Sequence, residues 1–153
     1  MRLPETSHNI KDTLGFTLIE LMLVIALMTT IGVFASAIGI SFYQSQLLHE
    51  TSDGLVSALR QAQGYAFSGR HDSAFGVSIE EGAYILFEGD SYAARVVSED
   101  VVFHMASTIS VSGPSEIVFS EILGVPSDIG IFSISLGTKE TQFEILPSGN
   151  IDR

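Results

Sequence analysis

A long run without charged side chains constrains this chain more than any other feature. Residues 21–49 contain no Asp, Glu, Lys or Arg, and most of the residues in the run are apolar. A helix of about 20 apolar residues crosses the hydrocarbon core of a bilayer, which is about 30 Å thick. The run therefore predicts one membrane-crossing helix near the N-terminus.

The residues just before this run form a distinctive pattern. They read Gly15-Phe16-Thr17-Leu18-Ile19-Glu20, so that a carboxylate stands at the start of the apolar segment. A carboxylate inside a membrane helix costs about 2.5–3.5 kcal/mol on insertion scales and is a functional hypothesis by default. The alternative is that Glu20 only reaches out to interfacial water. Gly15 has no side chain, which lets the backbone extend into a protease cleft without a clash.

This pattern resembles the processing and assembly signal of type IV pilins and of the pseudopilins of type II secretion. The resemblance covers residues 11 to about 40. It implies that prepilin peptidase removes a leader, residues 1–15, by cutting between Gly15 and Phe16, and that Phe16 is then N-methylated. It also implies that Glu20 meets the amino terminus of a neighbouring subunit during assembly. The implied partners are other pilin or pseudopilin subunits, the peptidase, membrane lipid before assembly, and an inner-membrane assembly platform with its cytoplasmic ATPase.

The basic residues around the apolar run set an expected orientation. Arg2 and Lys11 precede the run, and the next basic residue is Arg60. Cytoplasmic flanks of membrane helices carry an excess of Lys and Arg. We therefore expect a single-pass protein of the inner (cytoplasmic) membrane, with its N-terminus in the cytoplasm and its C-terminal domain in the periplasm or outside, before it joins a filament.

After the apolar run, the sequence changes to an amphipathic pattern in which apolar residues form a stripe along one face of a helix. Six small or apolar residues recur at spacings of three and four, the period of an amphipathic helix. They are Leu48, Thr51, Leu55, Leu59, Ala62 and Ala66. We predict one helix over about residues 17–67, within an N-terminal helical region at 16–69, and Gly69 offers a left-handed stop.

Residues 70–153 read as short strands separated by turns, and so predict a β-rich globular domain. Gly82 marks the turn of one hairpin, and Gly137-Thr138-Lys139 marks that of a second. We expect strands at 74–79, 83–88, 92–97, 101–104, 108–111, 117–120, 130–136 and 141–146. The predicted fold class is α+β, with a long N-terminal helix packed on an antiparallel, pilin-like β-sheet domain.

Weaker signals in this later region resemble the minor pseudopilin of the H type. They are the stretch Ala58-Leu59-Arg60-Gln61-Ala62, a strand beginning at Gly76, and a closing pattern of Phe143, Pro147 and Gly149. The chain has no cysteine, whereas many major pilins close a C-terminal loop with a disulfide. Together these observations favour a minor structural subunit over a major one.

The charge balance argues against nucleic acid as a partner. The chain has 18 Asp and Glu against 7 Lys and Arg, a formal net charge of -11. Binding to DNA needs clustered basic residues that displace counterions from phosphates. Here the basic residues after the leader are scattered singly among carboxylates, so we expect no direct DNA binding.

No catalytic pattern or cofactor motif is recognisable, and we expect a protein that is not an enzyme. His49, His71 and His104 are single histidines without metal-ligand spacing. Asp128, Asn150 and Asp152 lack the ligand spacing of a calcium loop, so the sequence predicts neither a metal nor another cofactor.

A second interpretation stays open. Ala35-Ser36-Ala37 is a small-x-small pattern that ordinary signal peptidase recognises, which would release a domain starting at Ile38. If the helix is instead never cut, it serves as a plain anchor. In either case the chain is a membrane-anchored or secreted β-domain binding protein unrelated to filaments.

Overall fold

The computed structural model describes residues 15–153, apart from the side chains of residues 35–38. The predicted leader lies outside the described residues except for Gly15, and so do the side chains of the alternative cleavage pattern at 35–37. The chain divides into two compact units, one ending at Ile40 and the other running from Ser41 to Arg153.

One long helix, α1 (Leu18–Phe67), runs through both units. It ends where the sequence predicts, because Gly69 takes the left-handed conformation (φ 64°) and its N–H bonds to the carbonyl of Ala66. All six residues of the predicted stripe are buried in the second unit, with exposed fractions between 0 and 7%. The prediction of an amphipathic second half is therefore confirmed.

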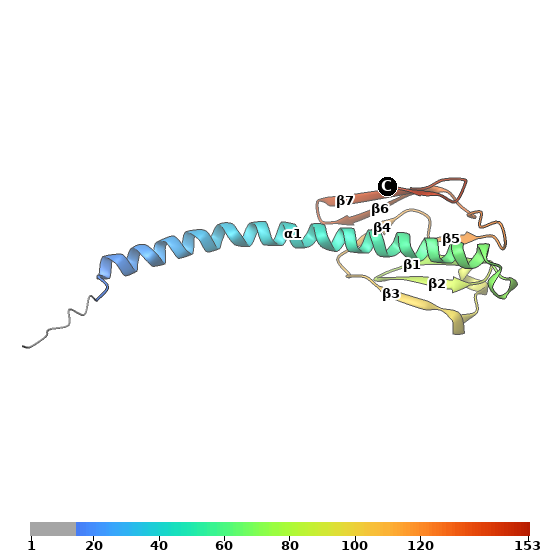
Figure 1. The fold of residues 1–153 in the computed structure, drawn as a ribbon, viewed down its shortest axis with the longest axis horizontal. Coiled ribbons are helices and arrows are strands. Elements are labelled where there is room, and N and C mark those ends of the chain that lie inside the picture. Colours follow the sequence, from blue (N-terminus) through green and yellow to red (C-terminus); the bar gives the residue numbers. More distant parts are fainter. Residues whose placement is uncertain (1–14) are drawn as a thin grey trace, which may run out of the picture. The chain divides into compact units, whose positions relative to one another are not determined.

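The remainder of the second unit consists of two four-stranded antiparallel sheets, which Figure 1 shows alongside the second half of α1. The first sheet has the order β3 (Val101–His104), β2 (Ala83–Glu88), β1 (Phe75–Glu80) and β5 (Glu116–Phe119). The second has the order β4 (Ser110–Ser112), β6 (Gly130–Leu136), β7 (Lys139–Ile145) and β8 (Ile151–Asp152). Three 3-10 turns complete the unit, η1 (Arg70–Asp72), η2 (Tyr92–Ala94) and η3 (Val97–Glu99).

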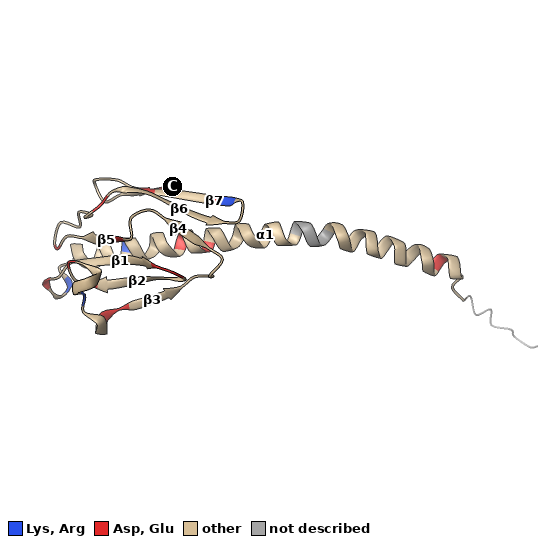
Figure 2. Cartoon of the chain, turned by 180° about the vertical axis from the view of Figure 1, so that it is seen from behind, with Lys and Arg blue, Asp and Glu red and all other residues tan. Residues whose placement is uncertain are grey.

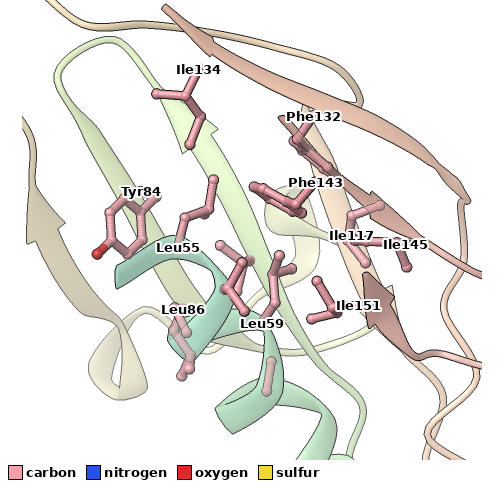
Figure 3. Close-up of a cluster of buried hydrophobic side chains, with 14 of the residues drawn as sticks. Leu55, Leu59, Tyr84, Leu86, Ile117, Phe132, Ile134, Phe143, Ile145 and Ile151 are labelled. Atoms are coloured by element: carbon pink, nitrogen blue, oxygen red, sulfur yellow. The ribbon is translucent and has the colours of Figure 1, made fainter. Parts of the chain in front are cut away.

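A single large hydrophobic cluster joins the helix to both sheets. Figure 3 shows Leu55 and Leu59 of α1 facing side chains from both sheets, including Leu86, Phe132 and Phe143. The rings of Phe132 and Phe143 stack with centroids 5.0 Å apart. Burial of one such side chain contributes about 1.5–3 kcal/mol, so the stripe on α1 and the inner faces of the sheets stabilise one another.

Both predicted hairpins are present. β1 and β2 are joined by a turn that contains Gly82 at φ 76°, and β6 and β7 by a turn that contains Gly137 at φ 63°. Along β6 the even-numbered residues Phe132, Ile134 and Leu136 are buried, whereas the odd-numbered ones face outward. The turn glycines thus located both hairpins correctly, and along β6 the buried positions alternate as expected.

The strand predicted at 92–97 is wrong. This segment forms η2 and η3 instead, because Arg95 folds back over its own turn. Its guanidinium lies 3.8 Å from the centre of the Tyr92 ring, donates to the Tyr92 carbonyl (2.8 Å) and pairs with Asp100 (2.8 Å). The composition of the segment did not reveal these contacts, and the two-residue strand β8 (Ile151–Asp152) was also missed.

The other predicted strands differ from the observed ones only at their ends. Those expected at 108–111, 117–120 and 141–146 are observed at 110–112, 116–119 and 139–145. The α+β class and the antiparallel arrangement are as predicted. The strands divide between two sheets, a split that no single stretch of sequence indicates.

Candidate functional site

The candidate site is the start of α1, where the predicted processing and assembly residues lie. Gly15 and Phe16 precede the helix, and Thr17 caps it. The Thr17 hydroxyl accepts a hydrogen bond from the backbone N–H of Glu20 (3.3 Å), and the Thr17 carbonyl accepts one from that of Leu21 (3.1 Å). A threonine three residues before a glutamate is a typical helix-starting pair. The local sequence thus starts the helix directly after the Gly15-Phe16 bond.

Glu20 is exposed in the first turn of α1. It is the one charged residue between positions 15 and 49. In Figure 2 the part of α1 that precedes the sheets is mostly tan, the colour of residues other than Lys, Arg, Asp and Glu. The free N–H groups of a first turn carry partial positive charge, which favours a carboxylate at this position. Glu20 has no salt-bridge partner among the described residues.

The space around Gly15 is open. No atom would lie within 4 Å of a Cβ placed there, so the fold of the described chain does not itself require glycine at this position. If glycine is needed, it is needed by a molecule that binds this segment. The neighbouring Phe16 is 85% exposed.

The described part of the first unit is mainly a helical segment, and its described apolar side chains are exposed. Every described side chain from residue 15 to residue 34 is exposed. An 18-residue window of α1 has a mean hydropathy of 2.4, and by length and composition this helix is able to cross a membrane. A signal sequence meets the same criterion. An exposed apolar surface of this extent marks a contact with lipid or with other protein chains. The large apolar residues concerned are Phe16, Leu18, Ile19, Leu21, Met22, Leu23, Val24, Ile25, Leu27, Met28, Ile31, Val33 and Phe34.

The hydroxyl groups within the apolar segment bond to the helix itself. Thr29 donates to the carbonyls of Ile25 (3.0 Å) and Ala26 (2.9 Å), and Thr30 donates to that of Ala26 (2.7 Å). A polar group in hydrocarbon must find its partner within the protein. Both threonines meet that requirement without help from another chain.

The other candidate residues of the sequence do not gather at one place. His49 and His104 are exposed single histidines. Asp128 and Asp152 each accept a hydrogen bond from the backbone N–H of the next residue, as turn residues do. The described structure instead brings together His71, Glu88 and Glu99, which sequence spacing did not indicate.

Comparison with known proteins adds no assignment. No family model, no curated protein and no solved structure matches this chain.

Proposed function

We propose that this chain is a structural subunit, of the minor kind, of a type IV pilus-like or type II secretion pseudopilus filament. The observation that carries the proposal is the start of α1. There Gly15, Phe16 and Glu20 stand immediately before a fully exposed apolar helical segment. The resemblance of this arrangement to prepilins assigns each of these residues a role.

In the proposed pathway the precursor enters the inner membrane with its N-terminus in the cytoplasm. Prepilin peptidase cuts the Gly15-Phe16 bond and Phe16 is N-methylated. The exposed side chains of the first unit lie in lipid until the assembly platform and its ATPase transfer the helix into the filament, where other subunits replace lipid around it. Both environments bury the same apolar surface, and this permits the exchange.

Glu20 sets the register in this proposal. Within a bundle of apolar helices an unpaired carboxylate is costly, and a positively charged amino terminus at residue 16 of a neighbour would offset that cost. Since residues 21–49 carry no other charge, Glu20 is the one carboxylate of the segment available for such a pair. A pair of this kind selects one axial position of the incoming subunit.

The N-terminal sequence and intact mass of the chain, purified from membranes of cells with and without a prepilin peptidase, test the proposal. We expect a chain that begins at N-methylated Phe16 only when the peptidase is present. A Gly15→Trp variant should keep its leader, because the open space at Gly15 lets the fold accept the larger side chain while the peptidase cleft does not.

Two other results would each overturn the proposal. A mature chain that begins at Ile38 would identify a secreted β-domain protein released by signal peptidase. A chain that retains Met1 in the presence of the peptidase would identify an uncut membrane anchor. In both cases the compact unit from Ser41 to Arg153 would be the functional part, acting as a binding domain.

A further inference from the structure

A mixed group of metal-ligand side chains lies in the second unit, far in sequence from the proposed assembly residues. A histidine ring nitrogen and two carboxylate oxygens, from His71, Glu88 and Glu99, all lie within 4.8 Å of one another. They come from η1, the end of β2 and η3. A backbone bond also joins the end of β2 to the residue before η3, from the Val96 N–H to the Glu88 carbonyl (2.9 Å).

Glu88 is the buried member of the group. Its side chain is 8% exposed, and its Oε2 lies 2.7 Å from His71 Nδ1. Its burial and this contact hold the carboxylate in one place, so that it offers an oxygen ligand in a fixed position.

His71 lies beside this carboxylate because its backbone adopts an unfavourable conformation. His71 and Asp72 have φ values of 55° and 50°, in the left-handed region that non-glycine residues rarely adopt. Such conformations persist where the surrounding structure holds them, and they cluster at ligand-binding sites. Here the result is that the imidazole faces the Glu88 carboxylate.

Glu99 completes the group and is free to move. Its side chain is 40% exposed, and its partner among the described residues is Arg70, at 3.7 Å. An exposed ion pair at this distance contributes little to the stability of the fold. Arg70 also lies over the Tyr65 ring, 4.4 Å from its centre, so its guanidinium keeps a favourable contact when Glu99 moves away.

We infer that His71, Glu88 and Glu99 together bind one divalent transition-metal ion of the zinc type. One nitrogen and two carboxylate oxygens, with water as a fourth ligand, match the preferences of Zn²⁺, whereas Ca²⁺ and Mg²⁺ prefer all-oxygen sets. Ligand atoms around a tetrahedral Zn²⁺ lie about 3.4 Å apart, from bond lengths of about 2.1 Å. His71 and Glu88 must therefore separate slightly, and Glu99 must swing inward.

Binding has two chemical consequences. The hydrogen bond between His71 and Glu88 is lost, because a ligating imidazole nitrogen carries no proton and a ligating carboxylate is ionised. The ion then links η1, the end of β2 and η3, and so fixes the turns that follow α1. This inference is independent of the proposed filament role, because it uses only residues of the second unit.

Titration of the full chain with Zn²⁺ tests the inference. The protein is purified in detergent without a histidine tag, stripped with a chelator, and titrated with Zn²⁺ and separately with Mg²⁺ in a calorimeter. We expect one Zn²⁺ per chain, no saturable Mg²⁺ binding, and a melting temperature that rises with added Zn²⁺.

The decisive variant is Glu99→Gln. It leaves the His71–Glu88 bond in place, so the melting temperature without metal should stay unchanged, while Zn²⁺ affinity should fall by about tenfold or more. His71→Asn, whose side chain tolerates the left-handed backbone, should abolish binding. His104→Asn is the matched control, because it removes an exposed histidine outside the group, and it should bind Zn²⁺ like the parent.

Several outcomes would overturn the inference. These are absence of saturable Zn²⁺ binding by the parent chain, equal affinity in the parent and Glu99→Gln, or a loss of affinity in His104→Asn as large as that in His71→Asn. The first would reduce the group to an ion-pair network. The second would remove Glu99 from the ligand set, and the third would place the ion at exposed histidines instead.

Discussion

The hydroxyl of Tyr84, on β2, occupies the space that a Cβ would take at Gly54, on α1. A methyl group at position 54 would lie closer than 3.0 Å to the Tyr84 oxygen, and 3.6 Å from the adjacent ring carbon. Gly54 is thus explained by one atom of a side chain 30 positions further along the chain. Figure 3 shows the Tyr84 side chain near Leu55. The helix and the first sheet come together at this contact.

The contact between Gly54 and Tyr84 predicts that a substitution at Tyr84 reverses the effect of a substitution at Gly54. Gly54→Ala alone should destabilise the protein by about 1–3 kcal/mol, the usual cost of overpacking. In a Tyr84→Phe background the same change should stabilise it by up to about 1 kcal/mol, because the clash is gone and alanine favours the helix. Urea unfolding in detergent of the parent, the two single variants and the double variant measures both effects. Equal effects of Gly54→Ala in the two backgrounds would contradict the contact.

Tyr84 also predicts a dependence on alkaline pH. Burial raises the pKa of Tyr84 above the usual tyrosine value of about 10. The unfolded chain therefore loses the phenolic proton at lower pH than the folded chain, and stability falls as the pH rises through about 10. Unfolding of the parent and of Tyr84→Phe should show a constant difference below pH 9. Above pH 10 the parent should lose stability relative to the variant, and parallel curves would refute this account.

Lys139 is predicted to hold the second hairpin against α1. Its ammonium group donates to the Ser41 carbonyl and hydroxyl and to the Ser45 hydroxyl (2.6 Å). Lys139→Met should cost about 1 kcal/mol and speed amide hydrogen exchange in the turn between β6 and β7. Thr138→Ala, in the same turn, is the control and should change neither quantity. Unchanged exchange in Lys139→Met would mean that the three bonds do not hold the hairpin.

Ile122 is predicted to be a strained residue whose replacement stabilises the protein. Its φ is 65° although its side chain is branched at Cβ, and its N–H bonds to the Ala66 carbonyl near the end of α1 (2.9 Å). Ile122→Asn should raise stability by about 1 kcal/mol, because asparagine accepts this conformation and the isoleucine is exposed. Ile129→Asn changes an exposed isoleucine at ordinary φ and should give no such gain. A similar gain at both positions would point to reduced surface hydrophobicity.

Glu20 is predicted to be required for assembly but not for cleavage. Glu20→Ala should leave cleavage at Gly15-Phe16 intact and prevent incorporation into filaments, because the variant lacks the charge that would meet a neighbour's amino terminus. Glu20→Gln keeps the size and polarity of the side chain and should fail in the same way. Amounts of processed chain in membranes and in sheared filaments measure the two steps. Normal incorporation of either variant would refute the charge-pair account.

The sequence by itself determined the features that depend on local periodicity. Charge-free residues 21–49, the stripe from Leu48 to Ala66 and the stop at Gly69 defined α1, because a helix repeats every 3.6 residues whatever packs against it. Alternation along residues 130–136 defined β6 in the same way. Gly15, Phe16 and Glu20 were recognisable because they are neighbours in the chain.

Only the tertiary structure decided which distant side chains meet. Arg95 turns the segment after β2 away from a strand by contacting Tyr92 and Asp100, and the division into two sheets depends on pairings such as β1 with β5. The group of His71, Glu88 and Glu99 is assembled from η1, the end of β2 and η3, and its members are 17 and 11 positions apart in the sequence. Such contacts depend on how the elements close around a common core, and no local pattern in the sequence encodes that closure.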